Sequence, residues 1–269
     1  VQAAWDNHFS AFGAQDLDKI MLDYTETSVL KNYDHHNANL TTWTGKAQIR
    51  QFFANLFAQL SDLSSLAAPV VEVTESPARQ VYLIWSAPSS GVESATDSFI
   101  FDNNNRIIQQ NIALTSGTHP NRYSSATQVT VGAPATLVAI DPAYSKATVQ
   151  AAWDNHFNAF GAQNVQQIMQ DYVAASVLKA FDHTTGKLET ATGLGPIQTF
   201  FQNLFATLSD LSTLAAPVIN VTESPRQVYL IWSASSSGIL SATDTFIFDS
   251  ANKIIRQNIA FASAPYQPA

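Results

Sequence analysis

The chain has 269 residues, of which 13% are charged, and its formal net charge is −8. This acidic balance and the lack of any basic run argue against nucleic acid as a partner. No apolar run approaches the roughly 18 residues needed to cross a bilayer, so we expect no membrane segment. The chain has no cysteine, which excludes disulfides and thiol catalysis.

One unit occurs twice in this sequence. The octapeptide QAAWDNHF at 2–9 returns at 150–157, and this offset of 148 holds to Pro77; beyond it the offset is 147. Over both blocks 77 of 112 aligned positions are identical. A period this long exceeds that of ordinary solenoid repeats, so each copy should bury its own core. We predict domains at 1–114 and 148–262, a linker at 115–147 and a tail at 263–269.

The first half of each copy is predicted to be mainly helical. In the first copy, apolar residues at spacings of three and four predict two short helices, over 5–12 and 17–24, with Asp16 as the cap of the second. A strand is predicted over 29–34. A loop ending near Gly45 then leads into a strongly amphipathic helix over 49–60.

The second half of each copy is predicted to be a series of strands. Alternating apolar residues, with turn residues between the runs, predict strands over 70–74, 80–87, 95–101 and 107–114. Helices at one end of the sequence and strands at the other predict an α+β fold. We expect a curved antiparallel sheet wrapped around the long helix.

Three stretches of the first copy resemble the nuclear transport factor 2-like superfamily, which includes ketosteroid isomerases and SnoaL-like polyketide cyclases. They are AFGAQDLDKIMLDYTETSVL, TGKAQIRQFFANLF and TDSFIFDNNNRII. The resemblance implies two tandem cone-shaped domains, each with a pocket. It is weak for function, since the superfamily includes isomerases, cyclases, hydrolases, transport factors and assembly domains.

The resemblance also assigns candidate catalytic residues. It places the isomerase's oxyanion-binding tyrosine at His8 and its protonated carboxylic acid at Asp97, which are His156 and Asp244 in the second copy. The general base falls on Asn32 in one copy and Ala180 in the other, so the base is missing from its usual place.

A carboxylate two residues further along the strand offers a substitute base. It is Asp34 in the first copy and Asp182 in the second, on the same strand face as the missing base. The alternative is that both are ordinary solvent-exposed residues at the start of a loop.

The roles of Asp97 and His8 are also open. Asp97 shares a strand face with Phe99 and Phe101, so it is either a buried acid held neutral to donate a hydrogen bond or a locally paired residue. His8 lies on the apolar side of its helix. It is either a hydrogen-bond donor to the pocket or a core histidine whose hydrogen bonds are satisfied within the protein.

Aromatic side chains are expected to line each pocket, which would suit an apolar ligand. They are Trp5, Phe12, Tyr24, Phe53, Trp85 and Phe99 in the first copy, and Trp153, Phe160, Tyr172, Phe201, Trp232 and Phe246 in the second. Because His35 and His36 are adjacent and point apart, we predict no metal site, and no cofactor is implied.

Two functional classes remain in competition. The missing base favours a non-catalytic module that binds an apolar small molecule or builds an extracellular assembly; the alternative is an isomerase or cyclase acting on an apolar carbonyl compound.

A neutral, polar surface composition favours secretion, where the sequons at Asn39 and Asn220 would be glycosylated. Self-association through the sheet faces is expected from the family. The linker is either a spacer or an arm that packs on a neighbouring domain, and its apolar residues favour packing.

Overall fold

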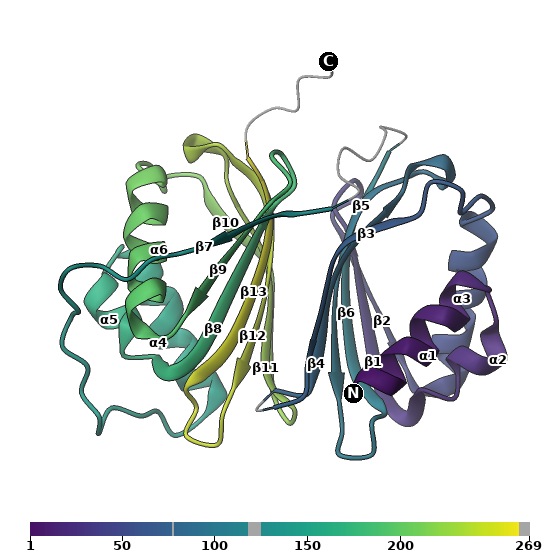
Figure 1. Ribbon diagram of the computed structural model, residues 1–269, viewed down its shortest axis with the longest axis horizontal. Coiled ribbons are helices and arrows are strands. Elements are labelled where there is room, and N and C mark those ends of the chain that lie inside the picture. The colour runs from purple at the N-terminus through teal and green to yellow at the C-terminus, as the bar shows by residue number, and fades with distance from the viewer. Residues whose placement is uncertain (77, 118–124, 264–269) are drawn as a thin grey trace. The chain divides into compact units, whose positions relative to one another are not determined.

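The computed structural model describes residues 1–76, 78–117 and 125–263. Its contacts divide the chain into two compact units, Val1–Ala126 (unit 1) and Thr127–Ala269 (unit 2) (Figure 1). Much of the expected linker, from Thr127 onward, therefore belongs to unit 2. No helix in the described part of the chain is long and apolar enough to span a membrane.

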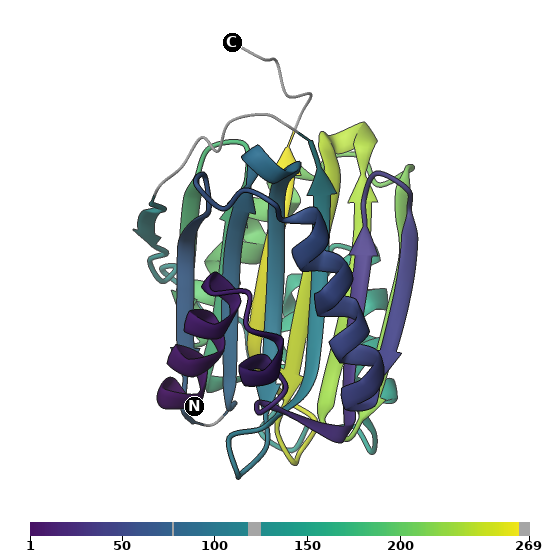
Figure 2. The same ribbon diagram turned by 90° about the vertical axis from the view of Figure 1, so that its right-hand side faces the viewer.

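Unit 1 contains three helices and six strands among its described residues. They are α1 (Gln2–Gly13), α2 (Leu17–Ile20), β1 (Tyr24–Asp34), β2 (Asn39–Thr44), α3 (Gly45–Gln59), β3 (Ala67–Thr74), β4 (Gln80–Ala87), β5 (Val92–Phe101) and β6 (Ile107–Ser116), with a 3-10 turn at Pro88–Ser90. In Figure 2 the three helices lie over one face of the sheet.

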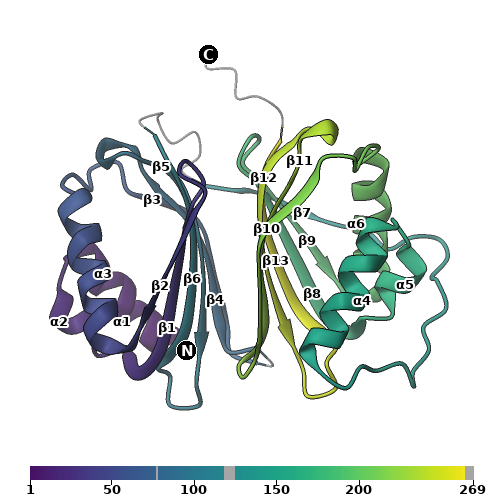
Figure 3. The same cartoon turned by 180° about the vertical axis from the view of Figure 1, so that it is seen from behind.

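Unit 2 repeats this order after one additional strand. Its elements are β7 (Thr127–Thr130), α4 (Val149–Gly161), α5 (Val165–Met169), β8 (Tyr172–Asp182), β9 (Lys187–Thr192), α6 (Leu194–Thr207), β10 (Leu214–Glu223), β11 (Arg226–Ala234), β12 (Ile239–Phe248) and β13 (Ile254–Ser263), with a 3-10 turn at Ser235–Ser237. Figure 3 shows α4, α5 and α6 on one side of this sheet. The predicted α+β class is confirmed.

The sheet of unit 1 has the strand order β2-β1-β6-β5-β4-β3. All neighbours are antiparallel except β1 and β6, which are parallel. The sheet is thus antiparallel as expected, with β1 and β6 as a parallel pair within it. A parallel pair needs a long crossover, and here β2, α3 and three strands separate β1 from β6 in the chain.

Two local predictions also need correction. The stretch before Gly45 was expected to be a loop, but it contains β2, which pairs with β1 from Asp34↔Asn39 to Val29↔Thr44. The second helix was expected to reach Tyr24, but it ends at Ile20, and Tyr24 begins β1. Asp16 caps that helix as expected, accepting a hydrogen bond from the Lys19 amide at 3.0 Å.

The core of each unit lies between the long helix and the covered face of its sheet. In unit 1 the buried side of α3 supplies Ile49, Phe52, Phe53 and Leu56 to one hydrophobic cluster. The cluster also contains Val81, Leu83 and Trp85 of β4 and Phe99 and Phe101 of β5. These apolar residues recur every three or four positions on the helix and every two positions on the strands. The same spacings predicted the helix and the strands from the sequence.

Gly45 begins α3 with a positive φ of +80°, and a Cβ there would lie 3.0 Å from the carbonyl oxygen of Glu26. We expect Gly45→Ala to lower the free energy of unfolding of unit 1 by about 1–3 kcal/mol, because the left-handed backbone and the close carbonyl both oppose a side chain. Urea unfolding measures this. Gly13→Ala is the control, since no atom lies within 4 Å of its added Cβ; an equal loss there would contradict the explanation.

Candidate functional site

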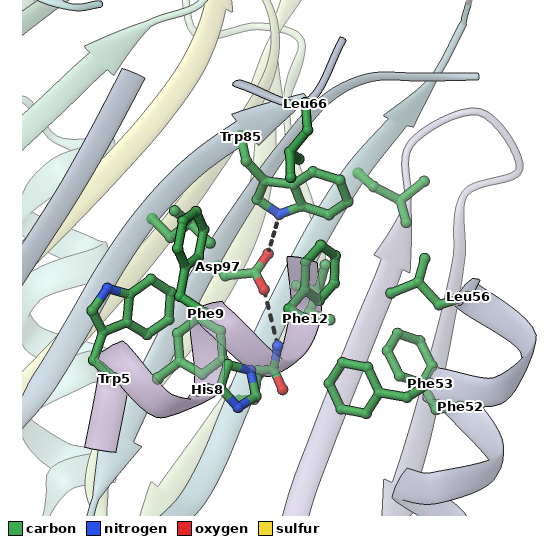
Figure 4. A pocket seen from close by; sticks show the side chains of 15 residues that line it. Trp5, His8, Phe9, Phe12, Phe52, Phe53, Leu56, Leu66, Trp85 and Asp97 are labelled. Carbon is green, nitrogen blue, oxygen red and sulfur yellow. Dashed lines mark hydrogen bonds between the residues drawn. The ribbon is translucent and has the colours of Figure 1, made fainter. Parts of the chain in front are cut away.

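Each unit contains a small cavity between its helices and the covered face of its sheet. In unit 1 the volume is about 20 Å³, which is room for about one water-sized molecule. Its walls are almost wholly carbon. The lining is Trp5, His8, Phe9, Phe12, Phe52, Phe53, Leu56, Leu66, Leu83, Trp85, Asp97, Phe99, Gln110, Ile112 and Leu114 (Figure 4).

The cavity of unit 2 has the same volume and matching walls. Its lining is Trp153, His156, Phe157, Phe160, Phe201, Leu204, Leu214, Leu230, Trp232, Asp244, Phe246, Gln257 and Ile259. The expected aromatic residues therefore border the two cavities, except for the tyrosines Tyr24 and Tyr172. Both tyrosines are buried in the adjoining core.

Asp97 is the centre of a buried hydrogen-bond chain. Its Oδ1 accepts from the indole N–H of Trp85 at 3.1 Å, and its Oδ2 accepts from the Gln110 amide at 2.9 Å (Figure 4). The Tyr24 hydroxyl in turn donates to the Gln110 amide oxygen. The chain thus crosses four neighbouring strands, β1, β6, β5 and β4.

Unit 2 contains the same hydrogen-bond chain. Asp244 accepts from Trp232 and from Gln257, each at 2.9 Å, and the Tyr172 hydroxyl donates to Gln257 at 2.5 Å. The candidate acid therefore has equivalent partners in both units. Neither the tryptophan nor the glutamine that holds it was identified as its partner from the sequence.

Burial raises the pKa of Asp97 to about 7, although its hydrogen bonds from Trp85 and Gln110 act in the opposite direction. Burial likewise raises the pKa of Asp244 to about 6, against its two hydrogen bonds and the charge of His156. The expected buried acid and the expected local pairing are thus both present. In the arrangement observed, however, Asp97 accepts hydrogen bonds from two N–H donors and donates none.

His8 combines both of its expected environments. It borders the cavity, its ring lies against Phe99 with centroids 5.2 Å apart, and its Nδ1 lies 3.1 Å from Oδ2 of Asp23. His156 pairs with Asp171 at the same 3.1 Å. In the described part of the chain the Nε2 of His8 has no hydrogen-bond partner.

The sequence prediction missed Asp23 and Asp171 as partners of the histidines. The usable signal was the spacing of 15 residues between histidine and aspartate, which both copies keep. A helical residue and a residue 15 positions later meet here because the chain turns back after α2. That return depends on the ends of two short helices, which are the least certain elements to place from sequence.

Asp34 and Asp182 do not reach the cavities. Asp34 accepts from the backbone amide of His36 and the side chain of Asn37, which is the local pairing of a turn residue. Asp182 accepts equivalently from the amide of Thr184 and the hydroxyl of Thr185. Both aspartates thus bond as residues at the start of a loop, although they are half-buried rather than solvent-exposed, and neither borders a cavity where it could act as a base.

The family's base position carries no titratable group in either unit. Asn32 is half-buried on β1, and Ala180 is buried on β8 within the hydrophobic core. Across the residues the structure describes, no three His, Asp or Glu side chains gather as a metal ion would require. His8 and Asp97 are therefore the titratable side chains at the unit 1 cavity.

Several solved structures resemble single units of this chain. They include a SnoaL-like protein of unknown function from Burkholderia thailandensis (15% identity, 42% of this chain and 92% of that chain, TM-score 0.34). A steroid delta-isomerase from Pseudomonas aeruginosa also matches (15% identity, 42% and 77%, TM-score 0.34). A third is a polyketide cyclase, so named provisionally, from Sinorhizobium meliloti (18% identity, 41% and 93%, TM-score 0.31).

The fold of each unit is given by its own elements, which are three helices on one face of a mixed sheet. No family model matches the chain, and no curated protein does so. Each of these three matches spans less than half of this chain. Each unit is a domain with a pocket.

The raised pKa values predict a specific pH dependence of stability. A carboxyl whose pKa is higher in the folded than in the unfolded chain stabilises the fold fully when the pH is below the unfolded pKa, near 4. This stabilisation is lost as the pH rises through the folded-state pKa, which is about 7 for Asp97 and about 6 for Asp244. The double variant Asp97→Asn/Asp244→Asn removes this loss. Its stability relative to the native chain should therefore increase between pH 4 and 8, by up to about 4 kcal/mol for Asp97.

Urea unfolding across this pH range measures the difference. The introduced amide at position 97 can accept from Trp85 and donate to Gln110 if the Gln110 amide rotates by 180°, so the hydrogen-bond chain can persist. Exposed Asp6→Asn serves as the control, because its carboxylate lies outside the core. A difference that stays constant from pH 4 to 8 would show that neither buried carboxyl ionises in this range.

Proposed function

We propose that each unit is a non-catalytic binding module for a small apolar molecule. The observation that supports this most is the cavity wall, which is almost wholly carbon although two titratable side chains border it. Both oxygens of Asp97 already accept hydrogen bonds, and His8 is turned to Asp23. A ligand there would meet apolar surface and aromatic rings.

The small cavity volume limits the size of the ligand. About 20 Å³ does not accommodate a steroid, so a larger guest requires movement of the wall. Phe9 is suited to such movement, since it borders the cavity and is 36% exposed. A benzene-sized ligand that buries roughly 150–200 Å² would gain about 4–5 kcal/mol, so dissociation constants near 1 mM are expected before the cost of ordering.

Toluene at millimolar concentration should raise the thermal midpoint of the native chain in a saturable manner. Leu66→Trp with Leu214→Trp should abolish this shift, because each leucine borders its cavity and a larger ring would fill it. Leu22→Trp is the matched control, since Leu22 is 57% exposed and outside the cavity. No shift in the native chain, or an equal shift in the filled variant, would refute binding in the cavities.

A second candidate function is acid–base catalysis, as in an isomerase or cyclase. The specific observation in its favour is the His8–Asp23 pair, which recurs as His156–Asp171. A carboxylate at Nδ1 holds the proton there, and Nε2 then has a lone pair with which to accept a proton. His8 would replace the base missing at Asn32.

Assay of a small β,γ-unsaturated ketone, whose double bond an acid–base isomerase would move into conjugation with the carbonyl, separates the two candidates. The non-catalytic proposal predicts no turnover above the rate in buffer. The opposite outcome is turnover by the native chain that is lost in the variant His8→Gln with His156→Gln, although toluene still raises that variant's thermal midpoint. This outcome would establish catalysis by the histidines. Extracellular assembly and self-association through the sheet faces stay predictions.

A further inference from the structure

Unit 2 holds an extended segment, residues 127–141, which we call the arm. The arm begins with β7, which adds a parallel strand to the edge strand β9, from Thr127↔Lys187 to Thr130↔Thr190. Backbone hydrogen bonds extend the pairing at both ends, from Thr127 to Gly186 at 2.9 Å and from Val131 to Thr190 at 2.8 Å. This is the strand addition by which many domains bind peptides.

Beyond β7, two glutamine side chains bind the backbone of the arm. Gln198 of α6 accepts from the amide of Val138 at 2.8 Å and donates to the carbonyl of Thr136 at 2.9 Å. Gln170 accepts from the amide of Asp141 and donates to the carbonyl of Ala139, each at 2.8 Å. Each amide therefore satisfies one donor and one acceptor of an extended chain.

A glycine lets the arm approach α6 closely. A Cβ on Gly195 would lie 2.8 Å from the Cβ of Ala133 and 3.4 Å from a methyl group of Leu137. The first distance is shorter than a carbon contact tolerates, so the arm requires a residue without a side chain there. Gln170, Gln198 and Gly195, together with β9, form what we call the seat of the arm.

Unit 1 lacks this seat although the two copies are otherwise closely similar. The positions of Gln170, Gly195 and Gln198 are occupied in unit 1 by Leu22, Ala47 and Arg50. Arg50 is instead paired with Asp18 at 2.7 Å, and Leu22 is 57% exposed. In the part of unit 1 that the structure describes, β2 remains at the edge of its sheet. Thus the two glutamines that bind the backbone of the arm and the glycine that lets it approach α6 are all replaced in unit 1.

We propose that the seat is a segment-recognition site present on unit 2 alone, and that the partner it fits is the arm of a second copy of this chain. The hydrogen bonds of the seat are made to backbone groups, and the apolar side chains Val131, Val138 and Ile140 pack partly buried against the core of unit 2; another copy's arm supplies both identically. The bound arm is only partly buried, with Leu137 54% exposed, so its release uncovers this contact while the core residues of unit 2 stay in place. Each chain offers one arm and one seat, and exchange links copies through unit 2.

Cross-linking tests this in the complete chain, which contains no native cysteine to interfere. One chain carries Val129→Cys and a second carries Glu189→Cys, since these positions are direct partners in the β7–β9 pair and paired strands lie within disulfide reach. After mixing and mild oxidation, we expect a mixed disulfide dimer. A chain with Thr41→Cys, the unit 1 counterpart of position 189, should give less than a tenth as much.

Two further chains make the outcome decisive. Val129→Cys with Glu189→Cys in one chain should form an internal disulfide, which verifies the geometry; if it does so while the mixture gives no dimer, arm exchange is wrong. Adding Leu22→Gln, Ala47→Gly and Arg50→Gln to the Thr41→Cys chain should raise its cross-linking several-fold. If the Thr41→Cys chain without those three substitutions cross-links as much as the Glu189→Cys chain, the arm does not select unit 2. If the three substitutions do not raise the cross-linking of the Thr41→Cys chain, the seat is wrongly assigned.

Discussion

A single buried carboxylate ties together the four strands that form the floor of each cavity. Asp97 lies on β5, and its partners Trp85 and Gln110 lie on the flanking strands β4 and β6, with Tyr24 of β1 bonded to Gln110. Burying a charge or an unpaired polar group is costly, so all four groups must stay in register together. The aromatic wall that these strands present to the helices depends on that register.

The same arrangement limits chemistry at the cavity. A carboxylate that accepts hydrogen bonds from two N–H groups is poorly placed to polarise a substrate's carbonyl group, because it has no proton to donate to the carbonyl oxygen. The proton arrives only when pH falls below the raised pKa. In that form the Asp97 hydroxyl needs an acceptor, and rotation of the Gln110 amide would supply one within the hydrogen-bond chain. The carboxyl is thus satisfied inside the wall in either state.

The sequence predicted elements with strong periodicity and the residues that they position. The long helix, β4 and the location of His8 and Asp97 followed from spacings of three, four and two. It did not predict β2, because an edge strand such as NLTTWT has little apolar alternation. The partners Asp23 and Gln110 were also missed, since each meets its partner through tertiary folding and neither has a distinctive local pattern. Asp34 was a candidate base only because it lies on the same strand face as Asn32. Its actual hydrogen bonds are made to the turn that follows β1.

Comparison of the two copies separates what the fold requires from what one unit has added. The hydrogen-bond chain of Asp97 and the histidine–aspartate pair are kept, while Leu22, Ala47 and Arg50 differ from the residues that hold the arm in unit 2. The most direct test of the central claim is native mass spectrometry of the complete chain with a library of small apolar compounds. A binding module predicts up to two bound molecules per chain, unaffected by Asp97→Asn and Asp244→Asn. No bound molecule, or binding that requires those carboxyls, would contradict it.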